Sequence, residues 1–160
     1  MNRRHFLRQA ATASAGAVAG SMLAAPAVAQ EAPKITWRMT SSFTKNTDIL
    51  WAASTDIAQS VKEASDGNFT INTFAAGEIV PGLQAADAVS NGTVEMAHSC
   101  CYYYIGKDPT FALGTAVPFG LNARQTNSWF TIGGGNDLLN EFLSGHGLYA
   151  LPAGNTGAQM

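Results

Sequence analysis

Strand-like and helix-like segments alternate between residues 35 and 99, and this order most constrains the fold. Residues 35–39 (ITWRM) alternate apolar and polar side chains, which is typical of a strand with one face more buried than the other. Residues 69–74 predict a second strand, and residues 94–99 predict a third that is buried on both faces. Apolar residues at three- and four-residue steps predict a helix over residues 47–65, and a second helix is expected over residues 82–90. This order predicts an α/β fold, with a parallel-dominated sheet flanked by helices on both faces.

The chain becomes richer in glycine and proline after residue 104. Two helices are predicted over residues 122–130 and 136–144, the second with Asn136 as its N-cap, and Gly133, Gly134 and Gly135 separate them as a helix break. Residues 148–151 begin a predicted fourth strand. A glycine-rich segment follows and ends at Met160, so we expect the chain to be truncated before a further element.

Residues 1–29 have the pattern of a removable export signal. Residues 2–8 (NRRHFLR) resemble the motif read by the twin-arginine translocase, residues 10–25 are small, weakly apolar and uncharged, and residues 26–29 (PAVA) fit a signal-peptidase site. A membrane anchor is the alternative, but it needs about 20 predominantly apolar residues. We therefore expect cleavage between Ala29 and Gln30, and a mature protein that the translocase exports to the periplasm.

Charge and cysteine content exclude several classes of function for the mature chain. Three of the nine Lys and Arg residues lie in the signal, which leaves six against eleven Asp and Glu, a net charge of −5. This balance argues against nucleic-acid binding, which needs clustered Lys and Arg. Cys100 and Cys101 are adjacent, so a disulfide between them would be strained. We interpret them as small buried residues rather than as ligands of a soft metal.

The sequence contains no catalytic motif, and we expect no enzymatic activity. It has no G-x-S-x-G elbow, H-E-x-x-H pair or P-loop lysine. His98 lies in an apolar strand, where a hydrogen-bonded core residue is favoured over a general base. His146 lies at a helix end, where a partly exposed capping role is favoured over catalysis.

Three consecutive tyrosines, Tyr102, Tyr103 and Tyr104, directly follow the third predicted strand. Ligands of open α/β sheets bind beyond the carboxyl ends of the strands. A tyrosine there offers a ring for packing and a hydroxyl to fix a polar group. The alternative is that one or two of these rings fill the core. Residues 40–43 and 155–159 are expected at the same edge.

Four segments in order resemble the N-terminal half of the solute-binding receptors of TRAP transporters, the DctP-type periplasmic subunits. The resemblance is greatest to the members that bind 2-oxoacids such as pyruvate. The segments are residues 34–43 (KITWRMTSSF), 76–89 (AGEIVPGLQAADAV), 102–113 (YYYIGKDPTFAL) and 154–160 (GNTGAQM). The resemblance implies a periplasmic-binding-protein-like fold of two lobes with the ligand between them. Residues 30–160 would form the N-terminal lobe, incomplete and truncated before the second lobe.

The same resemblance implies how the site is built. Tyr102, Tyr103 and Tyr104 would contact the substrate, and Gln159 would contact both the substrate and a bound cation, commonly sodium and possibly calcium. The arginine that clamps the carboxylate is expected beyond Met160. Arg38 is expected to pack or to form a local ion pair, and Arg124 to be solvated or to brace the lobe, so neither is assigned the clamp.

The implied function is that of a periplasmic subunit of a TRAP-type transporter. It would capture a small monocarboxylate, a 2-oxoacid such as pyruvate or a 2-hydroxy acid such as lactate, and deliver it to the membrane subunits, without a cofactor. One alternative keeps the receptor fold with a sugar acid or a C4-dicarboxylate as ligand. Another is an exported redox enzyme, but the mature sequence has no motif for a flavin, metal or molybdenum site.

Overall fold

The computed structural model describes residues 33–115 and 117–157. The predicted export signal over residues 1–29 and the predicted ligand residue Gln159 lie outside these residues, and both stay predictions.

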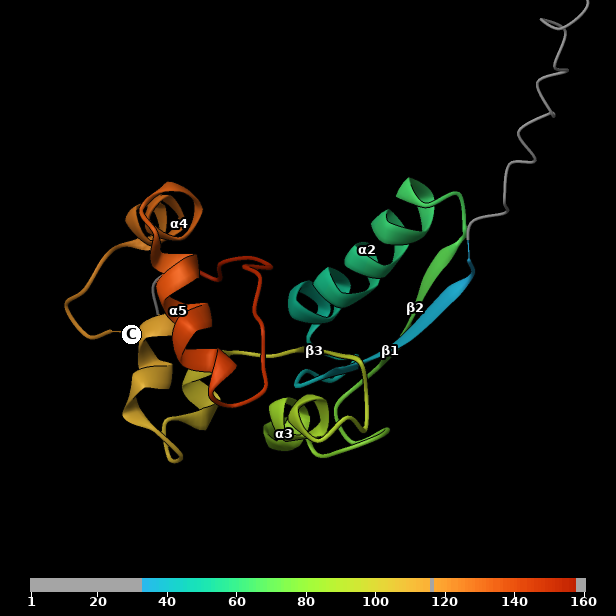
Figure 1. Ribbon diagram of the computed structural model, residues 1–160, viewed down its shortest axis with the longest axis horizontal. Helices are drawn as coiled ribbons and strands as arrows, with labels where there is room; N and C mark the ends of the chain where they lie inside the picture. Colours follow the sequence, from blue (N-terminus) through green and yellow to red (C-terminus); the bar gives the residue numbers. More distant parts are fainter. Residues whose placement is uncertain (1–32, 116, 158–160) are drawn as a thin grey trace, which may run out of the picture. The chain divides into compact units, whose positions relative to one another are not determined.

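A three-stranded parallel sheet and two flanking helices form the first part of the chain (Figure 1). Strand β1 is the central strand, with β2 on one side and β3 on the other. This confirms the predicted α/β order. The elements are β1 (Ile35–Ser41), α2 (Asp48–Ala64), β2 (Phe69–Phe74), η1 (Gly82–Gln84), α3 (Ala85–Ser90) and β3 (Met96–His98).

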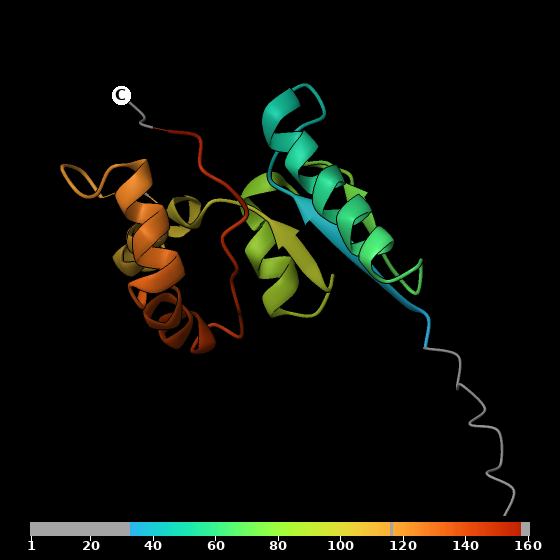
Figure 2. The ribbon, with the colours of Figure 1, turned by 90° about the horizontal axis from the view of Figure 1, so that it is seen from above.

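The strand order places the two helices on opposite faces of the sheet. Parallel strands are joined by right-handed connections in almost every known case. The step from β1 to β2 and the step from β2 to β3 run in opposite directions across the sheet. Right-handed connections therefore place α2 and α3 on opposite faces, as Figures 1 and 2 show.

The carboxyl end of β1 is the most buried part of the sheet. Met39, Thr40 and Ser41 are fully buried, and all three pair with β3, the first two also with the end of β2. The strand extends two residues beyond the predicted segment, into the polar residues Thr40 and Ser41. The prediction for β3 was wrong in two respects. The strand is only three residues long, and its residues are half-buried rather than buried on both faces.

Helix α2 begins and ends where the sequence predicts. Asp48 lies in its first turn, where a carboxylate interacts favourably with the helix dipole. At its end Gly67 has φ +78°, and its amide donates to the carbonyl of Lys62. One member of the predicted apolar series, Ile49, is nevertheless 86% exposed, and the one fully buried residue of α2 is Ser54.

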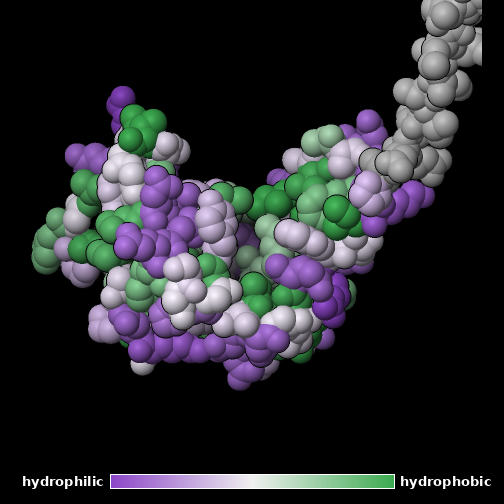
Figure 3. Space-filling view, in the orientation of Figure 1, coloured by the Kyte–Doolittle hydropathy of each residue, from purple (hydrophilic) through white to green (hydrophobic). Residues whose placement is uncertain are grey.

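The second part of the chain packs short helices around a small apolar core. Tyr104, Phe111, Leu139 and Leu143 form this core. The elements are η2 (Cys101–Tyr104), η3 (Pro109–Gly114), α4 (Ala123–Ile132) and α5 (Gly135–Ser144). Hydrophobic residues are exposed among hydrophilic ones over α4 and α5 (Figure 3). Ile132 and Leu138 are the large hydrophobic residues exposed on these two helices.

The glycine run between α4 and α5 is a helix break, as predicted. Gly133 follows the last residue of α4, and Gly134 precedes α5 with φ +79°. The predicted N-cap of α5 was wrong, because Gly134 occupies that position and Asn136 lies inside the helix. Helix α4 begins with a capping box between Asn122 and Gln125.

Residues 148–151 do not form the predicted fourth strand, and nothing in residues 33–115 or 117–157 pairs with them as a strand. The side chain of Asn140 takes the place of a strand partner. Its Oδ1 accepts from the amide of Ala150 at 2.6 Å, and its Nδ2 donates to the carbonyl of Ala150 at 2.9 Å. These bonds satisfy the backbone N–H and C=O groups of Ala150 without pairing to another strand.

Candidate functional site at the carboxyl edge of the sheet

The carboxyl ends of β1 and β3 meet at one edge of the sheet, which we call the carboxyl edge. It consists of Ser42 and Phe43 after β1, together with residues 98–104 at the end of β3 and beyond it. The amide of Ser42 donates to the carbonyl of His98 at 2.8 Å, so the pairing of the two strands continues one step past β1. Open parallel sheets bind their ligands at this type of edge.

On the α3 side of the sheet, three hydroxyl groups form a hydrogen-bonded chain. Ser42 Oγ lies 2.6 Å from the carbonyl oxygen of Gly82 and 2.7 Å from Ser99 Oγ. Ser99 Oγ lies 3.0 Å from the hydroxyl of Tyr104, which accepts from the amide of Ala86 at 3.0 Å. This hydroxyl chain ties both strand ends to η1 and α3.

On the α2 side, a second polar group lies beneath the edge. His98 Nδ1 lies 2.7 Å from Ser54 Oγ, and the amide of Phe43 donates to Ser41 Oγ at 3.1 Å. Burial lowers the pKa of His98, which favours the neutral imidazole. These contacts confirm the predicted hydrogen bond of His98, whose side chain is half-buried rather than fully in the core.

Aromatic rings continue from this group toward the predicted ligand residues. The rings of His98 and Phe43 have centroids 5.0 Å apart, and those of Phe43 and Tyr103 lie 6.4 Å apart. Tyr103 in turn meets Tyr102 edge-on at 4.6 Å. Burial, followed by a hydrogen bond with Tyr102, raises the pKa of Tyr103 to about 12. The hydroxyl of Tyr103 therefore stays protonated at neutral pH.

The structure separates the three tyrosines that the sequence grouped together. Tyr102 and Tyr103 are half-buried, whereas Tyr104 is 4% exposed and its ring lies against Phe111. The packing alternative is therefore favoured for Tyr104. The reason is local, because η2 has about three residues per turn and its consecutive side chains point in different directions.

Three residues at or next to the carboxyl edge had no role in the sequence-based prediction. Ser54 and Ser99 carry no motif, and Gly82 was noted only within the segment 76–89. They meet Ser41, Ser42 and His98 across 13 to 57 residues of sequence. The available signal was weak: hydroxyl residues cluster at the ends of two predicted strands, in residues 40–42 and at Ser99.

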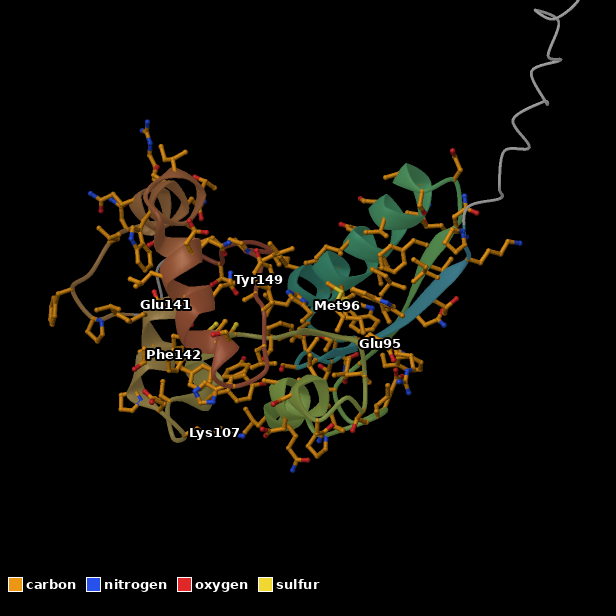
Figure 4. All side chains as sticks on the ribbon, viewed as in Figure 1. Glu95, Met96, Lys107, Glu141, Phe142 and Tyr149 are labelled. Atoms are coloured by element: carbon orange, nitrogen blue, oxygen red, sulfur yellow. The ribbon has the colours of Figure 1, made fainter. Side chains whose placement is uncertain are left out.

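The basic side chains nearest to the sheet form ion pairs. Arg38 binds Glu95, the residue before β3, which confirms the predicted local ion pair; Figure 4 labels Glu95 beside Met96. Lys45 Nζ lies 2.6 Å from Glu78 Oε1, and this hydrogen bond is the main reason why the pKa of Glu78 is lowered. Arg124 is exposed on α4, as predicted. None of these residues offers an unpaired guanidinium at the carboxyl edge.

Metal-binding and redox features are sparse in the part of the chain that the structure describes. No group of three or more His, Cys, Asp or Glu side chains in that part could hold a metal ion. Cys100 and Cys101 are half-buried free thiols, and burial raises the pKa of each. The same residue ranges also include no helix that is long and apolar enough to cross a membrane.

A cavity of about 370 Å³ has both Tyr104 of η2 and Phe111 of η3 in its wall. Asp87 and Lys107, both in the wall of this cavity, form an ion pair, and Lys107 is labelled in Figure 4. The remaining wall includes Ser90, whose hydroxyl donates to the carbonyl of His146. The backbone of His146 thus links the end of α5 to α3.

A model of the bacterial extracellular solute-binding proteins of family 7 matches residues 40–160. The chain belongs to this family. The match includes β1 from Thr40 onward, the hydroxyl chain and the tyrosine segment, and it confirms the resemblance to the solute receptors of TRAP transporters.

Named relatives of this family 7 protein are similar over much of its length. A monocarboxylate 2-oxoacid-binding periplasmic protein of Nostoc sp. is 44% identical over 162 residues, an alignment that covers all of this chain and 44% of the relative. A TRAP solute-binding protein of Bordetella bronchiseptica, crystallised with copurified calcium and picolinate, is 41% identical with a TM-score of 0.69. That alignment covers 71% of this chain and 34% of the solved one.

A third relative carries pyruvate. The TRAP periplasmic solute-binding protein of Pseudoalteromonas atlantica, solved with bound sodium and pyruvate, is 37% identical with a TM-score of 0.71. The alignment covers 74% of this family 7 chain and 36% of the solved one. The chain thus spans less than half the length of each of these three relatives.

Proposed function

We propose that this family 7 protein, at the full length of its relatives, is the periplasmic solute-binding subunit of a TRAP-type transporter. Its ligand is a small monocarboxylate, a 2-oxoacid such as pyruvate or a 2-hydroxy acid such as lactate, which it delivers to the membrane subunits. One observation carries the choice of ligand. The 44% identical relative is a 2-oxoacid-binding protein, and the 37% identical solved relative holds pyruvate.

The carboxyl edge suits a contribution to such a site. Tyr102 and Tyr103 present half-buried rings and hydroxyl donors, and small ligands are held by apolar walls with a few polar groups. In the proposed role these two residues pack on the ligand and donate to its oxygens, while Tyr104 supports the edge from within. Closure of two lobes about a hinge would then enclose the ligand.

A bound cation is part of the proposal. Two of the solved relatives were crystallised with calcium or sodium beside the ligand. Gln159 is our candidate contact to both the cation and the ligand, because a neutral amide oxygen suits hard cations. Residues from the other part of the receptor would complete the cation shell and supply the arginine for the carboxylate.

Export precedes this role. The proposed sequence of events is recognition of residues 2–8 by the twin-arginine translocase, cleavage after Ala29, and release of a receptor whose first lobe begins at Gln30. Family membership supports a binding and transport role rather than catalysis.

Isothermal titration calorimetry on the full-length receptor tests the proposed ligand class. Pyruvate and lactate are titrated with and without sodium or calcium, and succinate and gluconate represent the dicarboxylate and sugar-acid alternatives. Heat with the monocarboxylates, lost in Tyr103→Ala and retained in Tyr149→Phe, supports the proposal. If only succinate or only gluconate gave heat, the ligand would be a dicarboxylate or a sugar acid instead of a monocarboxylate. If none of the four compounds gave heat under any salt condition, the receptor role would be refuted.

A further inference from the structure

We propose that Ser54 and His98 form a positioning pair that fixes the ring of Phe43 and, through it, the ring of Tyr103 at the carboxyl edge. The inference rests on the proposed function, because Tyr103 is there a ligand contact. Neither member of the pair is itself proposed to touch the ligand.

The first step is the anchoring of His98 to α2. Ser54 is the one fully buried residue of that helix, and its hydroxyl lies 2.7 Å from His98 Nδ1. A hydrogen bond at one ring nitrogen fixes the orientation of an imidazole. Since Ser54 also lies 3.5 Å from Ser41 Oγ, the helix is tied to both strand ends at one point.

The second step is the contact of His98 with Phe43. The two rings meet edge-on with centroids 5.0 Å apart, and Phe43 is 5% exposed. The backbone of Phe43 is held by the same polar group, because its amide donates to Ser41 Oγ. Both the ring and the backbone of Phe43 are therefore oriented from the α2 side.

The third step reaches the proposed ligand contacts. Phe43 lies 6.4 Å from Tyr103, ring centroid to ring centroid, and Tyr103 meets Tyr102 at 4.6 Å. A continuous row of packed groups thus runs from Ser54 through His98 and Phe43 to the tyrosines. The position of α2 relative to the sheet is transmitted along this row.

A ligand-free experiment on the full chain tests the row directly. NOEs between the rings of Phe43 and Tyr103, and the ring chemical shifts of Tyr103, are measured by NMR in Ser54→Ala. We expect the NOEs to weaken and the shifts to change, because the His98 ring loses its anchor. Thr55→Ala is the matched control. Thr55 is the next residue of α2, and its hydroxyl bonds only to the carbonyl of Ala52 in its own helix.

Unchanged Tyr103 signals in Ser54→Ala, or the same change in Thr55→Ala, would overturn the inference. His98→Asn provides a second variant should Ser54→Ala unfold, since the asparagine amide keeps a hydrogen-bonding group near the position of Nδ1 but has no ring for Phe43. The Tyr103 signals should also change in this variant. A folded His98→Asn with unchanged signals would contradict a role for the ring contact.

Calorimetry on the full-length receptor tests the consequence for binding. Ser54→Ala should raise the Kd for pyruvate by about 2- to 10-fold, the lower part of the range expected for coupling between contacting residues. The same substitution should have no effect in a Phe43→Leu background, because the row is already broken there. An equal effect in both backgrounds would contradict transmission through Phe43. Absence of binding by the unmodified receptor would refute the proposed function, while the ligand-free NMR result would still decide the positioning role.

Discussion

The guanidinium of Arg38 binds both carboxylate oxygens of Glu95, with Nε 3.1 Å from Oε2 and Nη2 2.7 Å from Oε1. The backbone amide of Arg38 also donates to Oε2, at 2.8 Å. This bidentate pair fixes the residue that precedes β3 against the central strand. Because β3 is only three residues long, the pair supplements a short ladder.

Acid should therefore weaken the attachment of β3. The pair lowers the pKa of Glu95 from 4.5 to about 2, so its contribution to stability is fully present above pH 4.5 and is lost as the pH falls toward 2. In urea unfolding between pH 5 and pH 2, Glu95→Gln should lose less stability than the unmodified chain. Glu141→Gln, an exposed substitution on α5, should follow the unmodified chain; equal curves for all three proteins would contradict the prediction.

His98 should produce a second pH dependence in a different window. Burial lowers its pKa from 6.5, so the unfolded chain takes up the proton first as the pH falls. The contribution of neutral His98 to stability is fully present above pH 6.5 and declines below it. We expect the urea midpoint to fall between pH 7.5 and 5.5, and this fall to be smaller in His98→Asn. In the control His146→Asn the fall should persist. If it disappeared there, the pH dependence would belong to His146 and the prediction would be wrong.

Gly82 should not tolerate a side chain. A Cβ atom at this position would lie 2.7 Å from the carbonyl oxygen of Ser42, in the loop that follows β1. Overpacking of this kind costs about 1–3 kcal/mol. Gly82→Ala should lower the free energy of unfolding by that amount in thermal or urea unfolding. Gly106→Ala is the control, because its Cβ would meet nothing within 4 Å, and a change of similar size there would refute the steric explanation.

The hydroxyl of Tyr104 should contribute to stability more than an exposed tyrosine hydroxyl does. Tyr104→Phe leaves the amide of Ala86 without its acceptor and removes a partner of Ser99. Loss of a partner for a buried donor costs about 1–3 kcal/mol, and partial burial places this case at the lower end. Tyr149→Phe, at a residue that is 74% exposed, should change stability by less than about 0.5 kcal/mol. Equal effects of the two substitutions would contradict the hydroxyl chain.

Local patterns were enough to predict the elements whose burial follows from their own sequence. Alternation identified β1, the second strand was predicted over residues 69–74 where β2 lies, and periodic apolar residues identified α2 with its glycine end. Strand β3 was predicted too long because its length depends on the register with β1, which pairs only Met96, Ala97 and His98. Residues 148–151 were mistaken for a strand because no local signal shows that Asn140 would satisfy the backbone of Ala150.

The site was predicted only in part, for a similar reason. The tyrosine run lies beyond β3 as predicted, but the burial of each ring depends on a turn of 3-10 helix that turns Tyr104 inward. Ser54 and Ser99 join the edge only when α2 and β3 meet β1. Contacts that bridge such long stretches of sequence leave no periodic pattern for a reader of the sequence to detect.

The unequal pairing of the central strand has a kinetic consequence. Six residues of β1 pair with β2 through a connection that contains a single long helix, whereas three residues pair with the more distant β3. Bringing β1 and β2 together closes a shorter stretch of chain than bringing β1 and β3 together, so it costs less entropy, and it forms more ladder hydrogen bonds. We therefore expect the unit of β1, α2 and β2 to form early in folding, and β3 to join late, so that the carboxyl edge is completed in the final step.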